Sequence, residues 1–114
     1  KVHPKTLEAI ASHRTELISS IDSIFEGFDL LLCPSAAGPA PRGLEATGDP
    51  RMNLPWTYCA TPTVTLPAAL GPSGLPLGIQ LSGRRGSDRT LLAAAVAIKK
   101  LLQFHQRPPD PLSI

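Results

Sequence analysis

The stretch 62–83 constrains the fold most, because it combines two extended runs with a turn between them. The first run, 63–66, is rich in β-branched residues and lies between two prolines. In the second run, 77–82, apolar residues alternate with polar or small ones, which is the pattern of a strand with one apolar face. The sequence Gly-Pro-Ser-Gly at 71–74 suits a turn, because glycine tolerates positive φ and proline fixes its own φ. The stretch therefore predicts an antiparallel strand pair.

The segments on either side of this pair show helical and buried-strand patterns. Apolar residues recur every three or four positions over about 4–26 and over 87–105, which predicts two amphipathic helices. A continuous apolar run at 28–33 is typical of a strand buried on both faces, as in a parallel sheet covered by helices. The proline- and glycine-rich segment 34–51 is expected to be a loop that is functional or mobile. A short helix is expected at 53–60.

Together these elements predict an α/β fold with helices packed on a small mixed β-sheet. A length of 114 residues gives one small domain or a piece of a larger one, and the aromatic content of 4% predicts an aliphatic core. Residues 1–106 are expected to form the folded part and residues 107–114 a tail. On its own, a sheet this small exposes an edge and a face, which favours self-association.

Charge and cysteine content exclude several function classes. A net charge of +2 is too small to indicate nucleic acid as a partner, and no apolar run is long enough for a membrane span. The sequence Gly-Arg-Arg-Gly at 83–86 has the short pattern of an RNA-binding loop, but it follows a predicted strand, so we interpret it as an ordinary turn. Two cysteines are too few for a disulfide scaffold, and no secretory signal is apparent, so a reducing cytoplasm is expected.

Several motifs in order resemble one known family. The segments 29–34 (Asp-Leu-Leu-Leu-Cys-Pro), 62–67 (Pro-Thr-Val-Thr-Leu-Pro), 74–83 (Gly-Leu-Pro-Leu-Gly-Ile-Gln-Leu-Ser-Gly) and 88–92 (Asp-Arg-Thr-Leu-Leu) resemble the C-terminal segment of amidase-signature hydrolases. The resemblance runs from about 14 to 102. It implies that the chain is a fragment of a larger α/β/α sandwich.

The resemblance also implies an activity, the hydrolysis of a carboxamide C–N bond by a serine that a second serine and a lysine activate. The family's Gly/Ser-rich signature does not occur in this sequence, and the lysines fall at expected helix ends or on solvent-facing positions: Lys1, Lys5, Lys99 and Lys100. We therefore assign no catalytic residue here and predict that the isolated chain is inactive. The missing N-terminal part of the domain is then a required partner, and a small-molecule amide is the substrate. The alternative is a structural or binding fragment with no activity of its own.

By the same resemblance, the loop after the strand at 28–33 and the short helix lie near the acyl-binding cleft. The residues predicted to contact substrate are Ser35, Met52, Asn53, Trp56, Thr57 and Tyr58. The alternative for the aromatic residues is that they cover the sheet edge or pack on the first helix.

Two positions depart from the family pattern. The family often has Asn where Thr57 stands and Gly where Ala60 stands. Its tRNA-dependent amidotransferase branch keeps both more strictly, so the departure weakens an inference to that branch. A Gly serves close backbone approach or positive φ. Ala60 indicates either that neither is needed here or that the position is helical.

The remaining candidate groups are interpreted as structural. Cys33 and Cys59 match no zinc spacing and are predicted to be packed thiols. His3, His13 and His105 are predicted to be solvated side chains on polar faces. We therefore predict no metal site and no cofactor.

Overall fold

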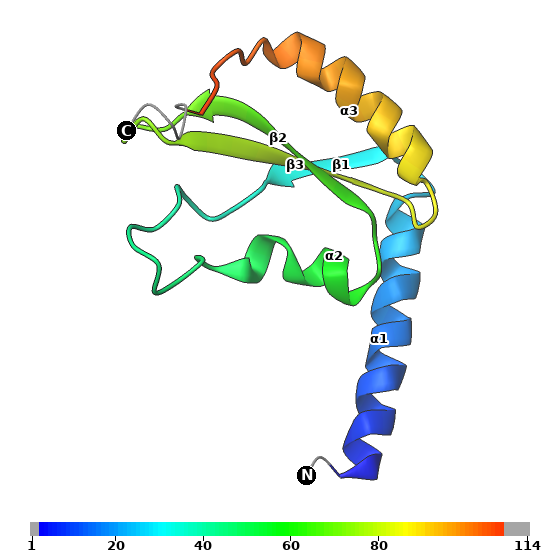
Figure 1. Cartoon of the computed structure of the whole chain (residues 1–114). Coiled ribbons are helices and arrows are strands. Elements are labelled where there is room, and N and C mark those ends of the chain that lie inside the picture. Colours follow the sequence, from blue (N-terminus) through cyan, green and yellow to red (C-terminus); the bar gives the residue numbers. More distant parts are fainter. Residues whose placement is uncertain (1–2, 109–114) are drawn as a thin grey trace.

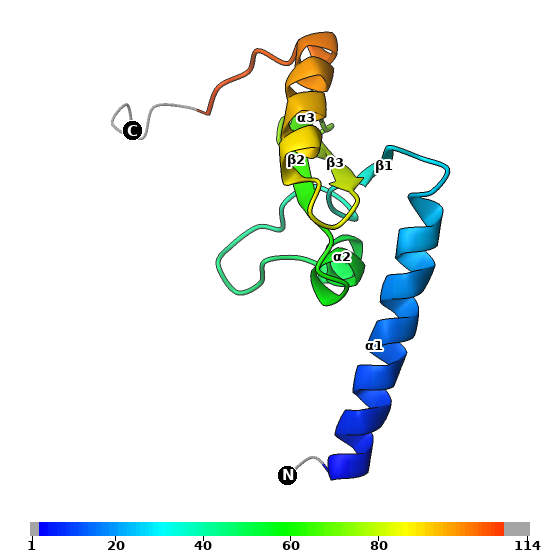
Figure 2. The same ribbon diagram turned by 90° about the vertical axis from the view of Figure 1, so that its right-hand side faces the viewer.

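The computed structural model describes residues 3–108, which form helices around a three-stranded sheet (Figure 1). The elements in chain order are α1 (Pro4–Ile24), β1 (Leu30–Pro34), the short 3-10 helix η1 (Pro50–Met52), α2 (Leu54–Tyr58), β2 (Thr63–Leu70), β3 (Pro76–Gly83) and α3 (Asp88–Leu102). The molecule is elongated, because α1 extends away from the sheet while α3 lies along it (Figure 2).

The strand pair predicted at 62–83 is present as β2 and β3, which pair antiparallel with Thr63 opposite Ser82. The register shifts between Pro67 and Ala69, where proline has no N–H to donate to the ladder. Strand β1 pairs antiparallel with the other edge of β3, so the strand order is β1-β3-β2. Strand β3 is therefore central and hydrogen-bonds on both sides.

The core lies between α3 and one face of the sheet. Its buried centre is Leu81, Leu91 and Ala95, and partly buried Leu30, Val64, Leu66 and Ile98 pack against it. The other face of β3 carries Gly78, Gln80 and Ser82, and it is directed away from α3 because successive strand side chains alternate. The charges of α3 complement its helix dipole, because Asp88 lies in the first turn and two lysines lie in the last.

The α/β class is confirmed, but two details of the expected sheet are wrong. The three strands that the structure describes pair only antiparallel, so this sheet is not mixed. Strand β1 is an edge strand, and Leu32 is 61% exposed instead of buried. The continuous apolar run at 28–33 correctly predicted a strand at this position, but not its exposure. Leu32 lies opposite Leu81 and so shares the sheet face that packs on α3, but residues 3–108 do not cover it at this edge.

Helix α1 is joined to the rest of the described chain by side-chain contacts near its middle and near its C-terminal end. The phenolic oxygen of Tyr58 donates to the carbonyl of Ile10 at 3.2 Å, and the Arg14 Nε donates to the carbonyl of Tyr58 at 2.7 Å. Near the C-terminal end, Asp22 forms an ion pair with Arg85 of the β3–α3 turn. The apolar stripe of the helix is largely exposed, at Leu7, Ile10, Leu17 and Ile24.

Several boundaries differ by a few residues from the expected ones. Helix α1 ends at Ile24 with Phe25 as its C-cap, slightly before the expected end near residue 26. Helix α3 ends at Leu102, and its C-cap Gln103 has a φ of 49°. The loop expected at 34–51 contains η1 at its end. Of the expected tail, residues 107 and 108 have no regular structure, and 109–114 lie outside the described residues.

Candidate functional site

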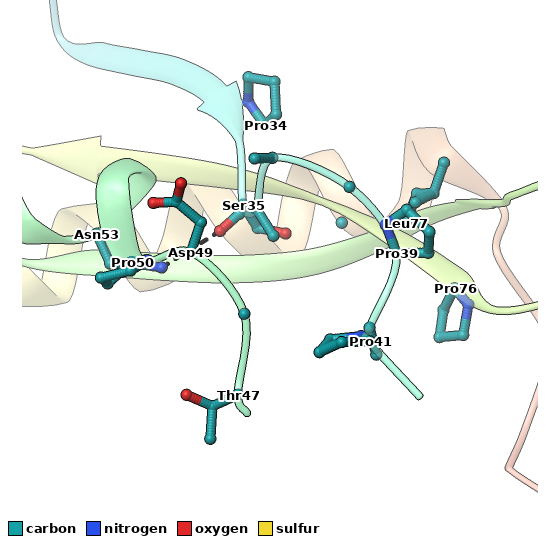
Figure 3. A pocket seen from close by; sticks show the side chains of 16 residues that line it. Pro34, Ser35, Pro39, Pro41, Thr47, Asp49, Pro50, Asn53, Pro76 and Leu77 are labelled. Carbon is teal, nitrogen blue, oxygen red and sulfur yellow. Dashed lines mark hydrogen bonds between the residues drawn. The ribbon is translucent and has the colours of Figure 1, made fainter. Parts of the chain in front are cut away.

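The loop that follows β1 forms part of the wall of an open cavity of about 600 Å³. Its lining comes from the loop itself, from η1 and from the start of β3: Pro34, Ser35, Ala36, Ala37, Gly38, Pro39, Ala40, Pro41, Thr47, Gly48, Asp49, Pro50, Asn53, Pro76, Leu77 and Gly78. Figure 3 shows Asn53, Asp49 and Pro50 on one side and Pro39, Leu77 and Pro76 on the other, with Ser35 between them. Five prolines make this wall stiff, because each fixes its own φ.

Two of the predicted substrate-contacting residues, Ser35 and Asn53, meet at this cavity. The Asn53 side-chain amide donates to the Ser35 carbonyl at 3.3 Å, across eighteen positions of sequence (dashed in Figure 3). Ser35 also donates its own N–H to the carbonyl of Gly78 at 3.0 Å, which continues the β1–β3 pairing by one residue. The cavity wall is therefore joined to the central strand at its base.

Gly78 lets the Ser35 side chain approach the sheet. A Cβ at Gly78 would lie 2.5 Å from the Ser35 Oγ, which is too close for a real contact, and 3.0 Å from the Thr65 Cγ2, which is unusually tight. A glycine in a strand often marks such close approach. Gly78 thus has a physical role in shaping the cavity.

The opposite wall begins with an Asp-Pro pair that starts η1. The Asp49 carboxylate accepts from the Arg51 N–H at 2.9 Å, which is a helix N-cap, and from the Arg51 Nε at 2.6 Å. The hydrogen bond from the Arg51 side chain has the larger effect and that from its backbone N–H the smaller, and together they hold the pKa of the Asp49 carboxyl below its ordinary value. The group lining the cavity is therefore an ionised carboxylate at neutral pH.

The other predicted contact residues lie outside this lining. The backbone carbonyl of Met52 accepts from the Gln80 side chain at 3.2 Å. Trp56 is half-buried in α2, and Thr57 is exposed. Tyr58 packs on α1, with the Arg14 guanidinium 5.9 Å from its ring centre. Packing on the first helix is the alternative that was stated for the aromatic residues. A substrate contact by any of these four residues stays a prediction.

Ala60, which follows α2, has a φ of 53°. The expectation that this position is helical or free of a positive-φ requirement is wrong. The chain turns in the left-handed region here, where residues with a Cβ are strained. The turn brings Thr61 back so that its N–H donates to the carbonyl of Trp56 at 2.9 Å.

The lining offers recognition by shape and hydrogen bonding. Alanine methyl groups and proline ring methylenes form its apolar part. Its polar part consists of the hydroxyls of Ser35 and Thr47, the Asn53 amide and the Asp49 carboxylate. Within residues 3–108, no group of three or more His, Cys, Asp or Glu side chains is placed to hold a metal ion. Cys33 is half-buried and Cys59 is buried, and both are free thiols.

Comparison with known proteins identifies the family. The family model described as Amidase matches residues 3–92, most of the chain. The chain therefore belongs to the amidase family, as its sequence motifs indicate.

Two curated relatives are each described as a subunit of glutamyl-tRNA(Gln) amidotransferase. That of Moorella thermoacetica is 34% identical over 104 residues, which are 85% of this chain and 21% of the relative. That of Gluconobacter oxydans is 34% identical over 102 residues, which are 83% of this chain and 21% of the relative. The chain thus spans about a fifth of the length of these relatives.

Solved structures agree on the fold. A crystal structure of an amidase superposes with a TM-score of 0.76 at 27% identity, covering 88% of this chain and 26% of that one. A 6-aminohexanoate cyclic dimer hydrolase superposes with a TM-score of 0.81 at 22% identity, covering 97% of this chain and 27% of that one, which shows a shared fold. In the part of the chain that is described, no helix has the length and apolarity that crossing a membrane requires.

Among the lining residues that were not predicted to contact substrate, three help to shape the cavity: Asp49, Pro50 and Gly78. Asp49 and Pro50 carry a readable signal, since an acidic cap before a proline marks the start of a helical turn. Gly78 also stands out as a glycine inside a strand pattern. The contact of Gly78 with Ser35 spans 43 positions and has no local signal.

Proposed function

We propose that this chain forms the C-terminal part of an amidase-family domain that hydrolyses a carboxamide C–N bond. Its own contribution is sheet core and one wall of the substrate pocket. In this proposal a serine nucleophile, a second serine and a lysine lie in the preceding part of the domain. The family match over residues 3–92, at a fifth of the relatives' length, supports this division of roles.

The observation that carries the pocket role is the hydrogen bond between Asn53 and Ser35 at the cavity. Both residues are predicted substrate contacts, one in the loop after β1 and one at the start of the short helix. A preformed concave wall with a few polar groups among apolar ones is typical of a small-molecule site. We infer that the cavity faces the amide substrate when the domain is complete.

The exposed apolar surfaces support the need for the preceding part. Leu7 is 55% exposed and Ile10 47% exposed on α1, and Leu92 and Val96 are more than half exposed on α3. Patches of this kind commonly mark an interface. The free thiols of Cys33 and Cys59 fit a reducing compartment, and we propose a cytoplasmic setting.

Activity should therefore appear only when both parts are present. The test combines this chain with the preceding segment of an amidase-family relative, by co-expression and as a covalent chimera in which residues 3–92 replace the matching segment. Ammonia release from a panel of carboxamides is measured for each part alone and for the two together. We expect turnover only from the combined protein.

Two variants sharpen the test. Leu81→Asp buries a charge in the core and should abolish both assembly and turnover. Asn53→Ala should keep assembly, seen by native mass spectrometry, and raise KM more than it lowers kcat. A combined protein that assembles yet releases no ammonia from amides that the intact relative hydrolyses would show a binding or structural fragment instead.

A further inference from the structure

Gln80 is a long polar side chain that is fully buried in the sheet. It lies on the central strand β3 and is 1% exposed. Burying an amide costs free energy unless its hydrogen bonds are made inside the protein. A residue kept there needs a specific partner, and the identity of that partner indicates its role.

The partner is the segment that forms one wall of the cavity. The Gln80 Nε2 donates to the Met52 carbonyl at 3.2 Å and lies 3.8 Å from the Cys33 Sγ. Met52 is the last residue of η1. The amide has two N–H groups, so both contacts can be made at once. Gln80 thus reaches from the sheet to η1, across 28 positions of sequence.

The wall has few other anchors. Within η1 and its cap, the hydrogen bonds are local: the Asn53 N–H donates to the Pro50 carbonyl, and Arg51 bonds to Asp49. Among the hydrogen bonds of the described residues, this segment is joined to β3 and to the end of β1 through two side-chain amides, those of Asn53 and Gln80. The hydrogen bond of the Asn53 amide is exposed to competition from water, whereas that of the Gln80 amide is partly shielded, because Gln80 itself is buried.

We propose that Gln80 is a positioning residue that holds η1 against the sheet and so sets the wall of the cavity that carries Asp49 and Asn53. Its action is indirect, since it touches the backbone of Met52 and does not line the cavity. Its consequence for substrate rests on the proposed function, but the tether itself is a property of this chain and is measurable without activity.

Trp56 gives a local probe of the tether. It is the one tryptophan in the sequence, and it lies in α2, which begins two residues after Met52. Gln80→Met keeps the length of the side chain and removes the donor. A lost hydrogen bond raises the population of the detached segment by roughly five- to tenfold. We expect stronger acrylamide quenching of Trp56 with an unchanged far-UV circular dichroism spectrum. Gln106→Met is the matched control, because Gln106 is exposed and distant in sequence.

A second variant covers the case in which Gln80→Met fails to fold, and it separates the tether from simple packing. Gln80→Glu can donate to the Met52 carbonyl only when its carboxyl is protonated. Burial raises the pKa of such a carboxyl, so the change should occur between about pH 5 and 8. Trp56 quenching should match the wild type at the acid end and increase at the alkaline end, while the wild type shows no such step. Packing alone would give no pH-linked recovery.

The measurements on these variants decide the inference. Increased quenching in Gln80→Met, or pH-linked recovery in Gln80→Glu, supports the tether. Unchanged quenching in a folded Gln80→Met, or an increase of the same size in Gln106→Met, overturns it. If Gln80→Met raises KM in the combined protein with little change in kcat, the tether also contributes to substrate binding. If the tether holds in the isolated chain and the combined protein shows no turnover, the proposed function fails and the positioning role stands.

Discussion

Replacing Ala60 by glycine should stabilise this chain, although most substitutions destabilise a protein. Ala60 has a φ of 53°, and a residue with a Cβ costs roughly 1–2 kcal/mol in the left-handed region. Glycine removes that strain, but it adds about 0.4–1 kcal/mol of conformational entropy to the unfolded chain. The Ala60 side chain is exposed, so its loss removes little burial. The expected net gain in the free energy of unfolding is therefore about 0.8 kcal/mol at the middle of these two ranges.

The measurement is urea unfolding followed by Trp56 fluorescence, four residues before the change, together with a thermal scan. The gain corresponds to an increase in Tm of roughly 2–6 °C. Ala97→Gly is the matched control, because Ala97 is exposed inside α3 and the same chemical change should there cost about 1 kcal/mol. Opposite signs at the two positions support the backbone argument. Destabilisation at both positions would refute a strained left-handed Ala60.

Two further changes test the contacts around the sheet. Gly78→Ala places a methyl 2.5 Å from the Ser35 Oγ, so it should lower the free energy of unfolding, measured in urea, by about 1–3 kcal/mol. Gly27→Ala is the control, because its methyl meets no atom within 4 Å, and it should change the free energy of unfolding by no more than about 0.5 kcal/mol. The hydrogen bond from Arg85 lowers the pKa of Asp22 in the folded state, so the ion pair contributes stability above about pH 4 that is lost as the pH falls through the folded pKa. The stability difference between wild type and Asp22→Asn should therefore shrink below about pH 4, and a pH-independent difference would contradict this assignment.

The parts of the fold that the sequence predicted well are those in which a local pattern and its partner lie close together. Strands β2 and β3 follow from alternation and an intervening Gly-Pro-Ser-Gly turn at 71–74, and their pairing needs no distant information. Helix α3 follows from its apolar spacing and packs on the strands that immediately precede it. Strand β1 was found as an element, but its neighbour was not, because an apolar run does not encode which strand edge it joins.

The candidate site was predicted in part for the same reason. The loop at 34–51 and Asn53 were indicated by composition and by resemblance, and the structure brings Ser35 and Asn53 together. The contacts that shape the cavity, from Gly78 to Ser35 and from Gln80 to Met52, join residues 43 and 28 positions apart. The first contact depends on the register of β1 on β3, and the second depends on how η1 lies against β3; no local pattern fixes either.

The distribution of exposed apolar surface favours one explanation for how this chain is covered. The exposed leucines and isoleucines of α1 lie on a helix that extends away from the sheet, while Leu92, Val96 and Leu101 lie on α3, on the far side of the sheet from α2 (Figures 1 and 2). A twofold dimer buries the same single patch on both copies. One such contact leaves either α1 or α3 exposed. In the function that we propose, the rest of the amidase domain covers this chain, and because the matched segment is only 21% of the relative from Moorella thermoacetica, that rest is large enough to reach both helices at once. The chain's surface is therefore better suited to completing a larger domain than to pairing with itself.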